Sequence, residues 1–389
     1  MSTPQLLLFL IGTLSAIAIL TTYVVYPLLI ALYARFFPRR WKTDENALPP
    51  VTMLVAAYNE AEVLEEKIRN FLAMDYPPDR LRLLIGSDGS TDGTQELLDR
   101  LCDGERVRYF AFGRGGKMKT VNQLATQVTT PYIIFSDANT MYHPQAARKL
   151  LRHFADDSIG GVCGKLVLRP VNESSGGRGE HTYWSFENLI KQWEGNAATT
   201  LGATGGIYAI RTEFFEPQPE EGYVADDFLL PMRILLRGKR FVFDGEALAT
   251  EDTMPDMRRE YHRKIRVAIS TFNAMRELRP RLHELPFSVR LMLFGHKTLR
   301  WLVPFFLVAI LLSAALLASL PWVWNWVLIP SVIFSVLALL AYVAESFGKR
   351  LGVLSLPLYF ISINVALLVG WWKFLSGAKA STWERSPRS

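Results

Sequence analysis

The sequence predicts an α/β domain with an open, doubly wound mixed sheet, joined to interfacial helices and to about four membrane-spanning helices. Two observations predict this arrangement. Between residues 50 and 251, short apolar runs alternate with helix-length segments, which is the pattern of a sheet built from βαβ units. Outside that region, charged side chains are absent from three stretches that are each long enough for a spanning helix of ~20 apolar residues.

The composition narrows the possible classes of protein. The chain has 389 residues, with 43 Lys and Arg against 37 Asp and Glu, and 50% of its residues are hydrophobic. These values exclude a disordered or collagen-like chain. Two cysteines are too few for a disulfide framework or for a zinc cluster of cysteines alone, and they fit a reduced, cytoplasmic environment.

The charge-free stretches run over residues 1–34, 301–344 and 351–372. The first predicts an N-terminal transmembrane helix (1–34), since its apolar run is too long for a signal peptide and no basic residues precede it. The second can hold two spans separated by a Trp-rich turn at 321–326, and the third can hold one. We therefore expect three spans within 301–374, followed by a tail (375–389).

Basic residues follow the first predicted span, namely Arg35, Arg39, Arg40 and Lys42. By the positive-inside rule, they place the following domain on the cytoplasmic side of the cell (inner) membrane. Four spans would then put the C-terminus outside, where four Lys and Arg residues after residue 372 conflict with the same rule. The side of the C-terminus therefore stays open.

Within residues 50–251, apolar runs predict buried parallel strands, and longer segments predict the helices between them. The predicted strands are Thr52–Ala57, Leu81–Ser87, Val107–Phe110 and Tyr132–Ser136. The predicted helices are Ala61–Ala73, Thr94–Leu101, Lys117–Thr126 and Pro144–Phe154. Residues 252–300 are basic and amphipathic, which is typical of helices at a membrane surface.

Polar residues follow each of these four strands. They are Tyr58-Asn59-Glu60, the run from Asp88 to Gly93, the run from Gly113 to Lys117, and Asp137-Ala138-Asn139. Taken singly, each is an ordinary turn, loop or helix cap. Because the carboxyl ends of parallel strands meet at one rim of an open sheet, together they predict a nucleotide site, with acids for ribose or base and a Gly-rich loop with a lysine for phosphate.

Five segments in order resemble the signatures of the family-2 inverting glycosyltransferases, whose nucleotide-binding fold is called GT-A. They are residues 55–60, 87–94, 135–140, 204–211 and 225–228. The resemblance covers residues 51–272, and the flanking spans match the membrane-integrated branch, which includes the synthases of cellulose, hyaluronan and poly-N-acetylglucosamine. It implies an enzyme that extends a cell-surface polysaccharide from a cytoplasmic nucleotide sugar, with a UDP-linked donor as the expectation.

The resemblance also implies which residues bind the donor nucleotide. Ala57, Tyr58 and Glu60 would border the nucleoside. Asp88 would bind the uracil, and Lys117 would reach the nucleotide from the Gly-rich loop.

A divalent cation, Mg²⁺ or Mn²⁺, is implied by the same resemblance. Asp137 belongs to the acidic motif that binds this metal, and the ion would bridge the phosphates. The usual second acid of the motif is Asn139 here, which offers only a weaker, neutral oxygen ligand. A helix-capping role for Asn139 is an equally open interpretation.

The acidic pair Asp226-Asp227 aligns with the family's catalytic acids. Asp227 matches the second acid and is the candidate general base, which takes the proton from the acceptor hydroxyl. Asp226 would raise the pKa of Asp227 by like-charge repulsion, or would bind the acceptor. The structural alternative is an acidic pair that starts a helix and is stabilised by the helix dipole.

The last signature of processive synthases, Gln-x-x-Arg-Trp, aligns with residues 263–267. Arg266 keeps the cation that faces the phosphate, and Arg263 replaces the glutamine. Val267 removes the aromatic ring that would border the acceptor, which argues against long-chain synthesis. The alternative acceptor is therefore a membrane lipid such as ceramide, diacylglycerol or polyprenyl phosphate, which would make the product a glycolipid.

Two non-enzymatic classes are weighed against this interpretation. A nucleotide-sensing membrane scaffold would have no need of Asp137 and Asp227, both of which are present. A transporter is disfavoured because the predicted spans carry no ionisable residue. The expected partners are the nucleotide sugar, the acceptor and the bilayer, and no nucleic acid; a homo-oligomer stays open.

Overall fold

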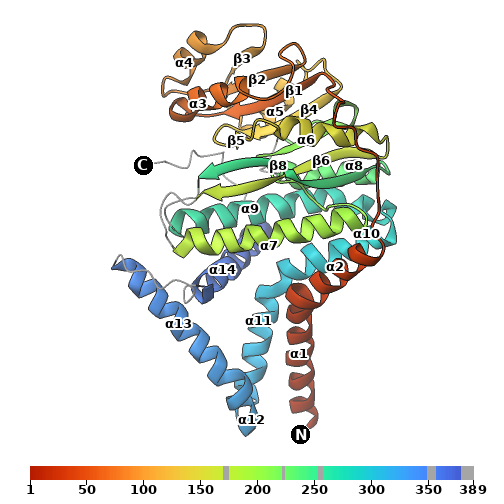
Figure 1. Ribbon diagram of the computed structural model, residues 1–389. Helices are drawn as coiled ribbons and strands as arrows, with labels where there is room; N and C mark the ends of the chain where they lie inside the picture. The colour runs from red at the N-terminus through yellow and green to blue at the C-terminus, as the bar shows by residue number, and fades with distance from the viewer. Residues whose placement is uncertain (170–174, 221–223, 253–256, 348–355, 378–389) are drawn as a thin grey trace.

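The computed structural model describes residues 1–169, 175–220, 224–252, 257–347 and 356–377. An eight-stranded sheet lies above two long helices, α7 (Ser175–Ala197) and α9 (Met257–Leu278), and the apolar helices extend away below them (Figure 1). Most of the predicted C-terminal tail falls outside the described residues.

The sheet has the strand order β3-β2-β1-β4-β7-β6-β8-β5. Its strands are β1 (Val51–Ala57), β2 (Leu81–Asp88), β3 (Val107–Phe112), β4 (Tyr132–Asp137), β5 (Met141–Tyr142), β6 (Ile159–Arg169), β7 (Tyr208–Arg211) and β8 (Arg240–Asp252). β1 to β4 are parallel, β7 is antiparallel to β4 and to β6, and β8 is parallel to β6. The predicted mixed sheet is thus confirmed.

Helices cover both faces of the sheet, as side chains alternate across each strand. Met53 and Val55 of β1 pack with α3 (Ala61–Leu72), α4 (Thr94–Leu101) and α6 (Ala146–Leu151). Leu54 and Ala56 belong to the opposite layer, with α5 (Lys117–Ala125) and α8 (Asp226–Leu236). Because both faces are covered, all seven residues of β1 are buried, which explains its continuous apolar sequence.

Four helical stretches are long and apolar enough to cross a membrane: 3–36, 287–316, 325–344 and 356–375. They contain α1 (Thr3–Leu20) with α2 (Tyr26–Phe36), α10 (Phe287–Met292) with α11 (Leu299–Leu316), α13 (Ile329–Ser346), and α14 (Leu356–Leu375); α12 (Pro321–Val323) lies just before the third stretch. α1 packs along α11, and α14 packs on α9. The second stretch begins at Phe287, earlier than the charge-free stretch from residue 301 predicts.

Six buried or largely buried side chains join α7 to the first two of these stretches, and we call them the interhelical charge cluster. They are Tyr26, Glu187, Glu194, His296, Lys297 and Arg300. The Glu187 carboxylate accepts hydrogen bonds from Lys297 Nζ and Arg300 Nη1, each at 2.6 Å, and lies 3.2 Å from His296 Nε2. Burial alone would raise the pKa of Glu187, but the charges of Lys297, His296 and Arg300 outweigh it and hold this pKa well below its ordinary value.

The second carboxylate of the cluster ties α7 to α2. Glu194 accepts a hydrogen bond from the Tyr26 hydroxyl at 2.5 Å and lies 2.8 Å from His296 Nδ1. The first two helical stretches approach closely here, because a Cβ added at Gly295 would lie 2.5 Å from Tyr26 Cδ2. Glycine is therefore required at this crossing.

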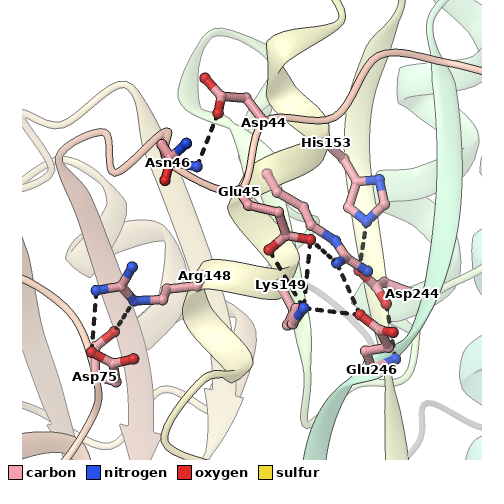
Figure 2. A network of polar contacts seen from close by, with 10 residues as sticks. Asp44, Glu45, Asn46, Asp75, Arg148, Lys149, His153, Asp244 and Glu246 are labelled. Carbon is pink, nitrogen blue, oxygen red and sulfur yellow. Dashed lines mark hydrogen bonds and ion pairs between the residues drawn. The ribbon is translucent and has the colours of Figure 1, made fainter.

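A second polar network fixes the segment between α2 and β1 (Figure 2). Glu45 of that segment pairs with Lys149 at 3.4 Å and with Arg152, which follows α6. Arg152 also pairs with the buried Asp244 of β8 at 2.7 Å, and His153 Nε2 lies 2.6 Å from the same carboxylate. The chain leaving α2 is thus held against one side of the sheet.

Candidate active site

The carboxyl ends of β1, β2 and β4 lie at one edge of the sheet, as the sequence predicts. β1 pairs with both neighbours, and Ala56 stands opposite Asp137 in the β1–β4 ladder. Asn59, which follows β1, has a φ of 54°, a left-handed conformation that asparagine tolerates. Its Oδ1 accepts a hydrogen bond from Thr91 N at 2.8 Å, so the turns after β1 and β2 support each other.

Asp88 and the Gly-rich loop form the predicted nucleobase corner. The buried Asp88 carboxylate accepts hydrogen bonds from Gly115 N at 2.6 Å and Gly116 N at 3.0 Å, and it pairs with Arg114. The Arg114 guanidinium lies 3.5 Å from the centre of the Tyr58 ring. In this structure Asp88 therefore holds the loop, and Arg114 covers the ring expected to border the nucleoside.

Arg114 was not predicted as a site residue. The signal was its place between two glycines of the predicted phosphate loop. Gly89, which follows β2, has a φ of +64°, and a Cβ there would lie 2.8 Å from Arg114 N. Glycine is thus needed to let the loop approach Asp88.

Two further predicted residues are buried behind this corner. Ala57 is fully buried at the end of β1, and Glu60 is 6% exposed. Glu60 donates its backbone N–H to Thr94 Oγ1 at 3.1 Å. Ala57 therefore presents no side chain to a nucleotide in this structure.

Replacing Arg114 with alanine is expected to weaken nucleoside diphosphate binding about tenfold, a loss of about 1.4 kcal/mol. The change removes both the charge beside the buried Asp88 and the flat cation on Tyr58. Because lysine lacks the planar guanidinium, Arg114→Lys is expected to recover little of the loss. Calorimetric titration measures the affinity, and Arg108→Ala on β3 is the matched control; equal losses in both variants would contradict the assignment.

Lys117 connects the predicted diphosphate site to the acidic pair. Its Nζ lies 3.0 Å from Asp137 Oδ1 and 3.9 Å from Asp226 Oδ1. Lys117 is the first residue of α5, directly after Gly116, whose φ of 91° turns the loop into the helix. One ammonium group thus stands between residues from β4 and α8 that are far apart in the sequence.

The loop 137–140 is held from behind by a buried lysine. Lys67 of α3 donates to Ser136 Oγ at 2.6 Å and to the Thr140 carbonyl at 2.5 Å. Burial lowers the pKa of Lys67 to about 7, although the charges of Asp137 and Glu251 act in the opposite direction. Lys67 was missed because the sequence of α3 reads as an ordinary amphipathic helix with its lysine in solvent.

Asp226 and Asp227 have different surroundings at the start of α8. Asp226 is buried and accepts a hydrogen bond from the Tyr208 hydroxyl at 3.2 Å. Asp227 is partly exposed, and its Oδ2 lies 3.4 Å from a Cβ placed on Gly205. Asp227 is therefore the acid of the pair that a bound acceptor can reach.

Although Asp227 is partly open to solvent, loss of hydration at its carboxyl, together with the neighbouring charge of Asp226, raises its pKa to about 6. Lys117 and Lys191 oppose this shift. Lys191 of α7 is itself buried and donates to the Ala203 carbonyl and to Thr204 Oγ1, each at 2.9 Å. Lys191 was not predicted as a site residue, since no motif contains it.

The residues aligned with the last signature lie on α9. Arg263 pairs with Glu260 at 2.7 Å, and Lys264 pairs with the same carboxylate at 3.2 Å. Arg266 is partly exposed, and Val267 is 45% exposed. α9 packs against α8. The ion pair with Glu260 holds the Arg263 side chain against its own helix.

The donor atoms near Asp137 fit a divalent cation that is completed by substrate phosphates. Among the described residues, no three His, Cys, Asp or Glu side chains cluster closely enough to hold a metal ion. Asp137 offers a carboxylate and Asn139 an amide carbonyl, and Mg²⁺ is commonly held by one or two carboxylates plus phosphate oxygens. The approach of the Lys117 ammonium to Asp137 agrees with a cation-attracting position.

Sequence comparisons place residues 52–217 in the family model "Glycosyl transferase family 2". The poly-beta-1,6-N-acetyl-D-glucosamine synthase of Staphylococcus aureus (strain COL) is 27% identical over 217 residues, 53% of this chain and 51% of that protein. The enzyme of the same name from Staphylococcus epidermidis is 23% identical over 207 residues, 53% of this chain and 49% of that protein. The chain thus spans about half the length of the curated relatives it matches.

A solved structure resembles nearly the whole chain. The mannosyltransferase PcManGT from Pyrobaculum calidifontis, in complex with GDP-Man and Mn²⁺, superposes with a TM-score of 0.71 at 22% identity, covering 93% of this chain and 99% of that one. The resemblance seen in the motifs is confirmed by the family model and by this shared fold. Residues 52–217 therefore match the glycosyltransferase family 2 model within a GT-A-like fold, and the described chain also holds four helices of membrane-spanning length.

Proposed function

We propose that this chain is a membrane-integrated inverting glycosyltransferase. It moves a sugar from a nucleoside diphosphate sugar, with a UDP-linked sugar as the first expectation, to the hydroxyl of a growing cell-surface polysaccharide. The observation that carries the proposal is the position of Lys117 Nζ, 3.0 Å from Asp137 and 3.9 Å from Asp226. It brings the diphosphate end and the acceptor end of a transfer reaction to one side chain.

The proposed chemistry assigns one role to each charged group. Asp227 removes the proton from the acceptor hydroxyl as its oxygen attacks C1 of the sugar. The bond from C1 to the diphosphate breaks on the opposite face, so the configuration at C1 is inverted. Lys117 stabilises the negative charge that develops on the departing diphosphate, and Arg266 serves as a further cation for the phosphates. Asp226 orients Asp227 and raises its pKa.

Asp137 and Asn139 would hold a divalent cation, Mg²⁺ or Mn²⁺, whose charge neutralises the leaving diphosphate when it is bound. The proposal is supported by the donor set at the end of β4 and by the Mn²⁺ of the mannosyltransferase complex. Chelation by EDTA is expected to lower turnover about 100-fold or more.

The acceptor has two candidates. A polysaccharide acceptor is supported by the similarity to the poly-N-acetylglucosamine synthases. A lipid acceptor is supported by the surface of this chain, where Val267 stands in place of an aromatic residue. Phe287 and Leu291, at the start of the second span, are 72% and 56% exposed. Such exposed apolar residues suit contact with lipid. The basic residues after α2 support a cytoplasmic domain in the inner membrane.

The test incubates detergent-purified full-length protein with radiolabelled UDP-sugars and GDP-sugars, with Mg²⁺, Mn²⁺ or EDTA, and with native lipids. Metal-dependent incorporation of label into a high-molecular-weight product would support a polysaccharide synthase. Label found in an organic extract would instead identify the acceptor as a lipid. NMR of the product determines the configuration at C1. Transfer of no sugar from any donor, or retention of configuration, would overturn the proposal.

A further inference from the structure

Asn139 leaves the proposed cation site one negative charge short of the usual acidic motif. The described residues offer a carboxylate next to it that no motif contains, namely Glu251. Glu251 lies near the end of β8, more than a hundred residues after Asn139 in the sequence. Its place in the sheet explains how the two meet.

β5 and β8 are antiparallel neighbours at the edge of the sheet. Met141 pairs with Thr250, and Tyr142 pairs with Ala249. Continuing this register by one step toward the loop brings Glu251 beside Thr140. The ladder therefore delivers the Glu251 side chain to the loop 137–140.

The contact between the two side chains fixes the orientation of the amide. Asn139 donates its Nδ2–H to Glu251 Oε1 at 2.7 Å. An asparagine amide carries its donor and its acceptor on opposite branches, so this bond directs the Asn139 carbonyl oxygen away from Glu251. A carboxylate can only accept here, so the alternative flip would set two oxygens against each other.

The charges around the loop 137–140 agree with a cation site to which both Asp137 and Glu251 contribute. The buried Lys67 ammonium binds Ser136 and the Thr140 carbonyl, and the two carboxylates whose charges act on it are Asp137 and Glu251. Asp137 at the end of β4 and Glu251 on β8 thus both lie close to Lys67, beside the loop 137–140. Both are partly exposed, as a cation site requires.

We infer that Glu251 supplies the second negative charge of the divalent-cation site and orients the Asn139 carbonyl toward the ion. This inference rests on the proposed function. Glu251 is a positioning residue, because it acts through Asn139. Groups that orient metal ligands typically change metal affinity about 10-fold to 100-fold when they are replaced.

The test measures Mn²⁺ binding to the full chain in the presence of UDP or GDP, by the EPR signal of free Mn²⁺. Glu251→Gln is expected to weaken Mn²⁺ binding about tenfold or more. The double variant Asn139→Asp with Glu251→Gln moves the negative charge from residue 251 to residue 139 and keeps a hydrogen bond between the two side chains. Its Mn²⁺ affinity is expected to lie within about threefold of wild type. Glu246→Gln, also on β8, is the matched control and should bind as wild type does.

A second measurement separates this role from a merely structural one. Nucleotide affinity is measured with Mn²⁺ and again with EDTA, and Glu251→Gln should weaken it only when the metal is present. Unchanged Mn²⁺ affinity in Glu251→Gln, or a double variant no better than this single one, would overturn the inference. Wild-type protein that binds nucleotide but no Mn²⁺ would overturn the metal proposal itself, so the two failures are distinguishable.

Discussion

Replacing Asp227 with asparagine is expected to lower kcat about 10³-fold while nucleotide affinity stays within about threefold of wild type. Asparagine keeps the size of the side chain but accepts no proton, so the acceptor hydroxyl loses its base. The measurement combines initial rates with labelled donor and a nucleotide titration. Asp157→Asn, whose side chain is 99% exposed, serves as the control. Equal turnover by Asp227→Asn and wild type would show that another group is the base.

The same assignment determines the pH dependence. A base must be ionised to work, and the pKa of Asp227 is raised to about 6 by burial and by Asp226, against the opposing charges of Lys117 and Lys191, with Asp137 adding to the rise. kcat/KM should therefore fall about tenfold per pH unit below that pKa and level off about one unit above it. A rate that stays flat through this range would contradict the assignment.

The largest expected loss of stability follows removal of Glu187. Glu187→Ala leaves the cations of Lys297 and Arg300, and His296 beside them, buried without their shared carboxylate, which typically costs about 3–5 kcal/mol. Thermal unfolding of the protein in detergent, followed by tryptophan fluorescence, should show a midpoint at least about 6 °C lower.

Two comparisons make this result specific. Glu65→Ala removes an exposed pair with Arg69 and should cost less than about 0.5 kcal/mol. Adding Arg300→Met to Glu187→Ala should recover part of the loss, because one stranded charge is gone. Since the folded pKa of Glu187 is depressed, the stabilisation should persist above pH about 4.5 and decline as the pH falls further. A midpoint unchanged by Glu187→Ala would show that the cluster contributes little.

The half of the sheet that carries the motifs was predictable because both of its faces are buried. β1, β2 and β4 read as continuous apolar runs, and their ends carry the residues that define the rim. β7 has only four residues, and β8 pairs with β6 through a register shift after Gly164, so neither produces a clean periodic pattern. Short or irregular strands of this kind are determined by their neighbours rather than by their own sequence.

Apart from Arg114, which lies in the Gly-rich loop, the site residues missed from the sequence have one property in common. Lys67, Lys191 and Glu251 are charged residues on regular helices or strands, where charge normally indicates a solvent-facing position. Their role depends on contacts with segments far away in the chain, such as Thr140, Thr204 and Asn139. Motif spacing detects residues that follow one strand, whereas these partners meet only after folding.

The charge-free stretch starts at residue 301, whereas the second apolar helical stretch begins at residue 287, for a related reason. His296, Lys297 and Arg300 interrupt the apolar pattern, so the charge-free stretch begins only at residue 301. In the structure these side chains pair with Glu187 and Glu194, and the helical stretch runs from residue 287.

The interhelical charge cluster has a consequence for how this enzyme is organised. A shortened protein of residues 50–251 would contain Glu187 and Glu194 but neither their cations nor Tyr26, and would leave two unpaired acids on the face that now meets these helices. The cluster thus joins the sheet domain to the helices of residues 3–36 and 287–316 by charge as well as by apolar packing.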